Sequence, residues 1–538
     1  MINEVELPTG WAQVELNDIC HIEMGQSPSS QFYNNNNEGY PLVGGASDFG
    51  SQTPESKKHT TDYKKLSSEG DILICIRATI GDLNWSDKTY CLGRGVAGLK
   101  AFQNIVPKYI WYSLINAMPY FNANTTGTTF PQVSSITLKK TPLLLPPLNE
   151  QNRIVDKIET LFSEVDAGIA NLTLAKRQLE QYRQSLLKHA FEGKLTAKWR
   201  EDYAEKHGKP LPSADELLKQ IQAARQNYYD QQMADWEQAV EAWEEEDKEG
   251  KKPRKPNALK KLESIADLNE INLPKLPSSW LWERLGLMTL SVEYGTSTKS
   301  EKQGLVPVLR MGNMQNGIID WDDLVFTSDT DEIEKYALKK GDVLFNRTNS
   351  PELVGKTSII LSDTKAIFAG YLIRVNQLDS IVYSKYLNYF LGSHIAKQYG
   401  NFVKTDGVNQ SNINGQKLMN YPFPYCSLDE QVLIVAELDK KIGTADKFKE
   451  EIESTIKKLV NLKTSILHKA FQGKLVPQDP NDPPASELLA QIKAEREAKA
   501  LAEKQAKQDK ATSKSKEKIK SAKTSKKSKK DEQITLPL

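Results

Sequence analysis

The sequence predicts an α+β protein in which two mixed α/β domains are joined by two long helices and related by an internal repeat. Three observations predict this class: motifs that occur twice, two long apolar stripes with helical spacing, and strand and turn signals confined to the regions between them. A chain of 538 residues is long enough for roughly two to four domains, each with its own core.

The repeat decides the architecture. Residues 148–151 (LNEQ) recur as 428–431 (LDEQ), and residues 187–195 (LKHAFEGKL) recur as 467–475 (LHKAFQGKL), in both cases 280 positions later. A constant offset means that no insertion or deletion lies between the two motifs, as a continuous helix requires if it is to keep its register. The two copies are therefore expected to be one structural element used twice.

Similarity extends beyond these motifs in both directions. Residues 214–221 (ADELLKQI) resemble 485–492 (ASELLAQI), and residues 7–11 (LPTGW) resemble 276–280 (LPSSW). Each half thus follows one plan, in which a Leu-Pro-x-x-Trp motif opens a variable region, a Leu-x-Glu-Gln motif begins a long helix and Gly-Lys-Leu closes it. The repeat gives a single chain a pseudo-two-fold relationship between its halves.

The two long helices are predicted from apolar residues at three- and four-residue steps. The first set is Ile154, Ile158, Leu161, Val165, Ile169, Leu172, Leu179, Tyr182, Leu186 and Ala190; the second is Ile434, Leu438, Ile442, Ala445, Phe448, Ile452, Ile456, Leu459, Leu462, Ile466 and Ala470. A helix of about 40 residues is on the order of 60 Å long and cannot bury such a stripe against one compact domain. The two helices are therefore expected to pack against each other, and two unrelated bundle helices would not share length, register and ending.

The variable regions carry the strand signals. Residues 70–77 (GDILICIR) indicate a turn followed by a buried strand, residues 341–347 (GDVLFNR) match them, and residues 93–99 (GRGVAGL) indicate a strand punctuated by glycines. Most of the remaining sequence differs between 12–147 and 281–427. The halves are therefore expected to share a framework and to differ in surface.

Two segments lie outside this plan. Residues 199–262 are strongly charged, with an acidic run at 244–247 and a basic run at 251–255, and are expected to form helical arms or a linker. The tail after about residue 497 is dominated by Lys, Ala and Ser, so it is expected to be disordered. Such a tail either rests on DNA phosphates or serves only to keep the protein soluble.

Composition narrows the class further. Lys and Arg number 71 against 70 Asp and Glu, so the net charge of +1 requires any basic surface for nucleic acid to be local. The four cysteines form no Cys-x-x-Cys pair and are expected to be buried thiols rather than zinc ligands or disulfides: Cys20, Cys75, Cys91 and Cys426. No apolar run reaches the roughly 20 residues of a membrane span, and the first residues lack a secretion signal, so a cytoplasmic protein without a membrane partner is expected.

Three short motifs suggest catalysis, but each lacks a required part. Residues 355–357 (GKT) end like a phosphate-binding loop, but Ser350 stands where its first glycine is needed. Residues 482–484 (DPP) resemble a base-flipping methyltransferase motif, but Ala485 replaces the aromatic ring. Residues 55–57 (ESK) resemble part of a nuclease metal motif, a pair that arises readily by chance. We therefore expect no catalytic residue and no metal site.

The duplicated motifs together resemble the specificity subunit of type I restriction-modification enzymes. The resemblance rests on the two Leu-Pro-x-x-Trp openings, the Pro-Leu-x-Glu-Gln helix start at 147–151 and the two Ala-Phe-x-Gly-Lys-Leu ends, and it covers nearly the whole chain. It implies target recognition domains at 1–147 and 276–427, each reading one half of a split DNA site. It also implies that the long helices, within 148–198 and 428–496, pair as an antiparallel coiled coil and set the spacer, with a charged helical arm at 199–275 and a disordered tail at 497–538.

The resemblance also implies the partners of the chain. They are double-stranded DNA, two methyltransferase subunits and two ATP-driven restriction subunits. The chain itself would be non-catalytic and bind no cofactor, with S-adenosylmethionine, ATP and Mg²⁺ on the partner subunits. The whole complex would methylate adenine at N6 and cleave DNA.

The residues that read bases are expected in polar loops beside the buried strands. Arg77 and Arg347 are the first candidates, because arginine can donate two hydrogen bonds to guanine, whereas Asn and Gln suit adenine. The other candidates are Gln26, Ser27, Arg94, Thr128 and Gln132 in the first domain and Arg310, Asn313, Asn349, Lys356, Asn409, Gln410 and Asn412 in the second. Some of these are equally suited to phosphate contacts or turn capping. Glu150, Gln151, Glu430 and Gln431 are expected to serve the helix starts rather than DNA.

Two other classes of protein do not account for the sequence. A fused methyltransferase or a nuclease would need a cofactor loop and a catalytic motif, and no stretch outside the repeat is large enough to hold them. A coiled-coil structural protein would explain the helices but not the strand and turn signals between them.

Overall fold

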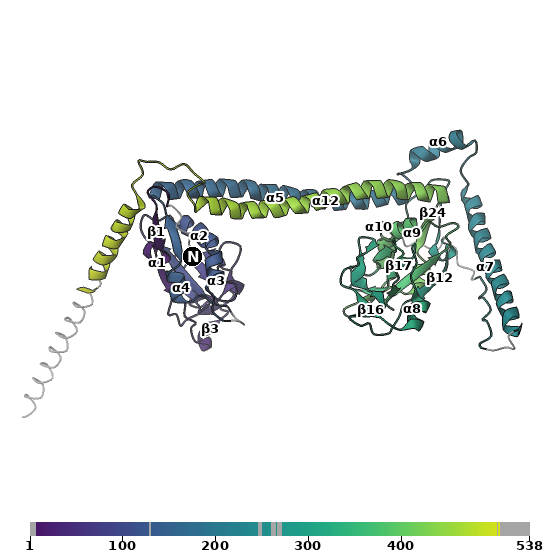
Figure 1. Cartoon of the computed structure of the whole chain (residues 1–538), viewed down its shortest axis with the longest axis horizontal. Coiled ribbons are helices and arrows are strands. Elements are labelled where there is room, and N and C mark those ends of the chain that lie inside the picture. The colour runs from purple at the N-terminus through teal and green to yellow at the C-terminus, as the bar shows by residue number, and fades with distance from the viewer. Residues whose placement is uncertain are drawn as a thin grey trace, which may run out of the picture. The chain divides into compact units, whose positions relative to one another are not determined.

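The computed structural model describes residues 7–127, 131–245, 250–259, 265, 272–502 and 504–505. The chain forms two compact units: unit 1 is Met1–Asn171 with Ser454–Leu538, and unit 2 is Leu172–Glu453. Each unit contains one α/β domain and parts of two long helices (Figure 1). The division therefore falls inside the long helices rather than at their ends.

In unit 1 the domain is built on two small sheets. One has the strand order β2 (Cys20–Met24), β9 (Val96–Ala101), β6 (Ile72–Cys75) and β7 (Leu83–Trp85); the other has the order β3 (Tyr33–Asn34), β5 (His59–Thr60), β4 (Tyr40–Val43) and β8 (Cys91–Leu92). Its short helices are α1 (Leu16–Ile19), α2 (Pro107–Asn116), α3 (Met118–Ala123) and α4 (Ser135–Lys139). A separate antiparallel pair, β1 (Ala12–Glu15) with β10 (Pro142–Leu145), closes the domain where the chain enters and leaves it.

In unit 2 the domain has a larger sheet. Its order is β12 (Thr289–Tyr294), β21 (Leu372–Gln377), β17 (Val343–Asn346), β19 (Thr357–Ile359), β15 (Ile318–Ile319) and β14 (Met314–Gln315). Two smaller sheets have the orders β16 (Val325–Thr327), β13 (Val306–Leu309), β20 (Ile367–Phe368) and β18 (Thr348–Asn349), β23 (Ser411–Asn412), β22 (Thr405–Asp406). The helices are α8 (Thr330–Tyr336), α9 (Ser384–Leu391), α10 (His394–Val403) and α11 (Gly415–Met419). The pair β11 (Leu281–Arg284) with β24 (Pro422–Tyr425) corresponds to β1 with β10.

The predicted turn and buried strand are present in both domains. Gly70 and Gly341 have φ of 85° and 95°, a conformation that favours glycine. The aspartate that follows each glycine stabilises the turn. The carboxylate of Asp71 accepts a hydrogen bond from Ser68 N at 2.7 Å, and that of Asp342 accepts one from Lys339 N at 3.0 Å. The strands that follow, β6 and β17, are buried along their whole length.

The glycines at 93 and 95 lie in a loop rather than in the strand that the sequence predicted. A Cβ on Gly93 would lie 2.8 Å from the Cα of Gly44, and one on Gly95 would lie 2.3 Å from the carbonyl oxygen of Gly44. The backbones approach too closely for any side chain, and the regular strand β9 begins only at Val96.

The long helices begin at the Leu-x-Glu-Gln motifs. Helix α5 is Leu148–Phe191, 44 residues long, and α12 is Leu428–Ala470, 43 residues long. In unit 2 they lie side by side (Figure 1), with ion pairs Lys176–Glu453, Glu180–Lys449 and Arg183–Asp446 at 2.7, 3.6 and 3.3 Å. As the numbers on α5 rise by four and three, those on α12 fall by the same steps, so the helices run antiparallel there. In unit 1, Asp166 and Lys463 form a further ion pair between them at 2.5 Å.

The pairing leaves part of the predicted apolar stripe uncovered. Ile158 and Ile442 are buried as expected, whereas Tyr182, Phe448 and Leu462 are 45%, 53% and 44% exposed. The stripe is broader than the seam between two helices, so residues at its margin face outward.

The charged segment is helical over α6 (Ala197–His207) and α7 (Ala214–Glu245). Leu217 and Ile221 of α7 are buried in the core of unit 2. In unit 1, the matching Leu488 and Ile492 belong to a helical stretch at 485–502 and are buried in the core there. The acidic run is described only at 244 and 245, and the tail beyond 505 lies outside the described residues.

Four free cysteines are buried, as the sequence indicates: Cys20, Cys75, Cys91 and Cys426. In the part of the chain that the structure describes, no helix combines the length and the apolar character of a membrane span.

Candidate nucleic-acid interface

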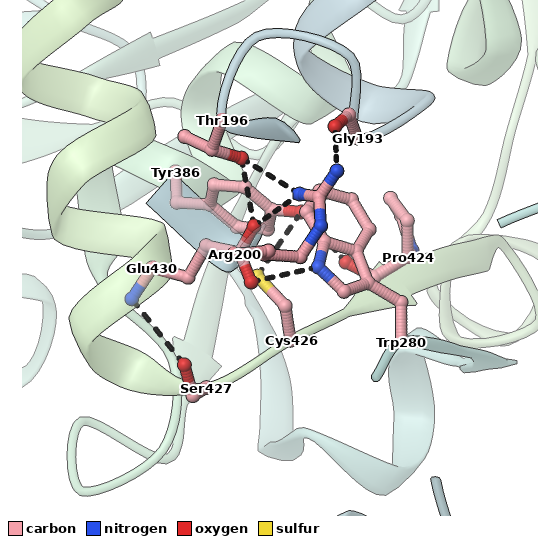
Figure 2. Close-up of polar contacts among 9 residues, drawn as sticks. All are labelled: Gly193, Thr196, Arg200, Trp280, Tyr386, Pro424, Cys426, Ser427 and Glu430. Carbon is pink, nitrogen blue, oxygen red and sulfur yellow. Dashed lines mark hydrogen bonds and ion pairs between the residues drawn. The ribbon is translucent and has the colours of Figure 1, made fainter. Parts of the chain in front are cut away.

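Each domain is fixed to the start of a long helix by a buried glutamate. In unit 2, the indole Nε1 of Trp280 donates to Oε2 of Glu430 at 2.8 Å (Figure 2). The other oxygen, Oε1, accepts hydrogen bonds from Thr196 Oγ1 at 2.7 Å and Arg200 Nη1 at 2.5 Å. Arg200 also donates to the carbonyl of Gly193 and lies over the Trp280 ring at 5.6 Å. Glu430 is only 1% exposed, so this charge is paired where water does not reach it.

The neighbouring glutamine ties the helix start to the domain. The side-chain amide of Gln431 accepts a bond from Tyr383 N and donates to the carbonyls of Ile381 and Cys426, each at 2.9 Å. In unit 1, Gln151 accepts from Val106 N at 3.0 Å and donates to the carbonyl of Pro146 at 3.1 Å. These buried amides support the prediction that the Glu-Gln pair serves the helix start.

The junction of unit 1 has the same framework but different charges. Trp11 Nε1 donates to Oε2 of Glu150 at 3.0 Å, while Oε1 is buried without a hydrogen-bond partner among the described residues. Burial raises the pKa of Glu150. The nearby cation, Arg153, instead pairs with Asp482 at 2.7 Å, and Asn149 donates to the same carboxylate at 2.9 Å. Asp482, the first residue of the methyltransferase-like motif, thus holds the junction together.

In each unit, the motif that closes one long helix contacts the motif that opens the adjoining domain. Gly193 has φ of 71°, and a Cβ there would lie 2.5 Å from Cγ of Pro277 in the second Leu-Pro-x-x-Trp motif. In unit 1, Gly473 has φ of 69° and meets Cγ of Pro8 in the same way, at 2.5 Å. The sequence motifs gave no sign of this contact, because the partners lie far apart along the chain.

The phenylalanine two residues before each of these glycines packs against aromatic rings of the adjoining domain. The ring of Phe191 lies 5.2 Å from that of Tyr386 and 5.4 Å from that of Phe390, and the ring of Phe471 lies 5.4 Å from that of Tyr109. Helix α5 therefore ends against the domain that precedes α12, and α12 ends against the domain that precedes α5.

Five of the six candidates in the first domain gather at the end of β6. Arg77 forms a bridge with Gln132, and the preceding Ile76 N bonds to Gly95 O at 2.9 Å, next to Arg94. The backbone N of Arg94 donates to Ser27 Oγ at 3.2 Å, and Gln26 precedes Ser27. All five side chains are exposed. Thr128 lies outside the described residues.

In the second domain, Arg347 does not occupy the position of Arg77. The backbone of Ile76 accepts a bond from Val133 N, and that of Arg347 accepts one from Ile413 N, so Arg347 corresponds to Ile76. The Arg347 side chain is half-buried, lies over the Tyr294 ring at 4.9 Å and donates from Nε to Gly370 O at 3.2 Å. Thr348 is the residue that matches Arg77.

Four second-domain candidates lie on the small sheet β18–β23–β22 and its loop. Asn349 pairs with Ser411 across the sheet, and Asn412 Nδ2 donates to Thr348 Oγ1 at 2.8 Å. Asn409 and Gln410 are exposed in the loop that joins β22 to β23. Lys356 is half-buried and lines a cavity of about 1260 Å³ between this domain and the unit 2 parts of α5 and α12.

The remaining two candidates, Arg310 and Asn313, form hydrogen bonds with the turn at residues 320–323. Arg310 Nη2 donates to the carbonyl and carboxylate of Asp323 at 2.7 and 3.0 Å. Asn313 is 3% exposed and donates to the carbonyls of Asp320 and Asp322, both at 3.1 Å. Both residues were expected in polar loops that read bases, but the turn takes up Nη2 of Arg310 and the side-chain amide of Asn313, so these donors are not free for a base.

The fold and these sites define an internally duplicated protein in which a common junction carries two domains with different loops. A family model described as the type I restriction modification DNA specificity domain matches residues 8–173 and 293–458. The chain belongs to this family.

Named relatives agree with this assignment. The chain is 24% identical to the type I restriction enzyme EcoBI specificity subunit of Escherichia coli, over 91% of this chain and 93% of the relative. It is 31% identical to a putative type I restriction enzyme MjaX specificity subunit of Methanocaldococcus jannaschii, over 36% of this chain and 45% of the relative. A chain from a solved structure concerned with complex assembly and conformational transition of the type I R-M system shares the fold, with a TM-score of 0.59, 19% identity and coverage of 87% of this chain and 99% of that one.

Proposed function

We propose that this chain is the specificity subunit of a type I restriction-modification complex and that each of its domains reads one half of a split DNA sequence. The observation that carries the proposal is the contrast between a repeated junction and unlike loops. Trp11 with Glu150 and Trp280 with Glu430 hold the two domains in the same way, whereas the loops beyond β6 and β17 present different side chains. A fixed framework with interchangeable loops suits a protein that reads two different half-sites.

The proposed DNA-contacting residues are the exposed and half-buried polar side chains near the ends of β6 and β17. They are Gln26, Ser27, Arg77, Arg94 and Gln132 in unit 1 and Arg347, Asn349, Lys356, Asn409, Gln410 and Asn412 in unit 2. Arginine and amide side chains read guanine and adenine edges in the major groove, and lysine neutralises phosphates. Thr128 stays in the proposal on its sequence position alone.

In this proposal the long helices act as an antiparallel coiled coil that sets the spacer between half-sites. Two methyltransferase subunits and two restriction subunits bind the chain in the cytoplasm. They carry S-adenosylmethionine, ATP and Mg²⁺, and the chain itself performs no chemistry. Two identical methyltransferase subunits suit a chain whose junctions are repeated, because each copy can dock on an equivalent surface.

The test is adenine methylation and DNA binding by the chain alone and after mixing with its methyltransferase partner, with S-adenosylmethionine present. We expect methylation only in the mixture, at a two-part sequence that sequencing of the methylated DNA identifies. A duplex with either half-site scrambled serves as the control and should lose methylation. Methylation by the chain alone would show that it is catalytic. If neither the chain alone nor the mixture binds a specific sequence, the chain has a purely structural role.

A further inference from the structure

A fully exposed valine stands at the tip of a hairpin in unit 2. Strands β22 and β23 are joined by residues 407–410, and Gly407 N donates to Gln410 O at 2.7 Å across the loop. This places Val408 and Asn409 at the tip. Val408 is 100% exposed, so it contributes no packing within unit 2.

The hairpin is held from several sides. Asn412 Nδ2 bonds to Thr348 Oγ1 at 2.8 Å, and Lys417 Nζ bonds to Thr405 Oγ1 at 2.6 Å. The hydroxyl of Ser411, a buried residue, donates to the carboxylate of Asp406, and Ile413, two residues further along, is 1% exposed. The tip therefore projects from a base that is already ordered, so binding a ligand costs little further ordering.

A valine at this position is unfavourable for the free protein. Turns favour Gly, Asn, Asp and Ser, and an exposed branched side chain leaves apolar surface in water. The side chains next to it, Asn409 and Gln410, are exposed amides of the kind that pair with adenine. The apolar group on a base edge in the major groove is the C5-methyl of thymine. Amide and methyl recognition together match the two bases of an A·T pair.

We propose that Val408 packs against the C5-methyl group of a thymine in the half-site read by unit 2 and thereby sets specificity at that position. The inference rests on the proposed function and adds to it one residue and the base that it recognises. Uracil lacks the C5-methyl group but keeps the pairing edge of thymine, so it isolates this contact.

The experiment uses the full chain with its methyltransferase partner on the target found by methylation mapping. Failure to find a target would count against the proposed function and not against this inference. Each thymine of the half-sites is replaced in turn by uracil, and the dissociation constant is measured for the wild type and for Val408→Ala. At one thymine we expect uracil to weaken binding by the wild type roughly fourfold, the effect of losing about one buried methyl group. Val408→Ala should bind the thymine and uracil duplexes equally.

Leu305→Ala is the matched control, because Leu305 is a 71% exposed apolar residue on another loop of unit 2. It should keep the wild-type preference for thymine. The inference is overturned if the wild type shows no thymine preference at any position, or if Val408→Ala keeps that preference while weakening both duplexes alike. Val408 makes no packing contact that its loss would remove, so equal unfolding midpoints for the variant and the wild type would exclude misfolding as the cause.

Discussion

The indole Nε1 of Trp280 lies 2.8 Å from one oxygen of Glu430, and Arg200 donates a hydrogen bond to the other oxygen of the same carboxylate. Trp11 and Glu150 repeat the indole bond at 3.0 Å, but no hydrogen bond reaches the second oxygen of Glu150 from the described residues. Two equivalent glutamates therefore differ in one respect: Glu430 is bonded directly to a cation, and Glu150 is not. Substitutions at the two positions should have opposite effects on stability.

Glu430→Gln should lower the free energy of unfolding by about 3 kcal/mol, because it leaves the guanidinium of Arg200 largely buried without a counter-charge. Denaturant unfolding followed by tryptophan fluorescence measures this change. Glu437→Gln is the control, since Glu437 forms an exposed pair with Lys441 at 3.8 Å and should change stability by less than about 0.5 kcal/mol. Equal effects of the two substitutions would show that the buried pair contributes no more than a surface one.

Glu150→Gln should be tolerated at neutral pH. Burial raises the pKa of Glu150 above its ordinary value of 4.5, so in the window above 4.5 the folded chain binds this proton more tightly than the unfolded chain does. The wild type therefore loses stability as the pH rises through this window, and stability is regained as the pH falls. The glutamine variant should lack this slope and be at least as stable at neutral pH. Unfolding in urea at a series of pH values tests this, and a less stable variant at neutral pH would mean that the junction needs the ionised carboxylate.

Gly193→Ala should destabilise unit 2 more than Gly208→Ala does. Both glycines have positive φ, 71° and 64°, so both substitutions carry a backbone cost of about 1 kcal/mol. A Cβ at Gly193 also meets Pro277 at 2.5 Å, whereas nothing lies within 4 Å of one at Gly208. The difference between the two losses of unfolding free energy measures the contact between helix end and opening motif. Equal losses would mean that Pro277 moves aside without cost.

Arg77→Ala should weaken binding of the complex to its target and relax discrimination at one base pair, by about 1 to 3 kcal/mol. Arg310→Ala is the control, because Nη2 of Arg310 is already bonded to the carbonyl and the carboxylate of Asp323. Dissociation constants for the target and its single-base variants distinguish the two. A uniform loss across all sequences for Arg77→Ala would assign this residue to a phosphate instead of a base.

Much of the architecture could be predicted because it depends on short motifs whose residues are neighbours in the sequence. The helix starts at Leu148 and Leu428 and the buried strands after Gly70-Asp71 and Gly341-Asp342 follow from short motifs. The outward position of Tyr182 and Phe448 could not be predicted, because the spacing of apolar residues does not show how much of the stripe the partner helix covers.

The candidate site was harder to predict than the fold. Arg77 and Arg347 follow similar strands, but one additional residue before Arg77 turns the two side chains to opposite sides of the chain. Asn313 resembles an exposed loop amide in the sequence and is buried by carbonyls of residues 320 and 322. Such assignments depend on tertiary contacts that a single sequence does not encode locally.

The unequal charges at the two junctions also bear on how duplicated segments can be exchanged. A helix end carrying Arg200 would offer Glu150 a directly bonded cation, because the nearby Arg153 pairs with Asp482 instead. The segment carrying Asp482 would instead place a second carboxylate near Glu430, with Leu433 at the position that corresponds to Arg153. An exchange of these two segments is therefore expected to be asymmetric: the segment carrying Arg200 suits both glutamates, whereas the segment carrying Asp482 suits only the junction that has Arg153.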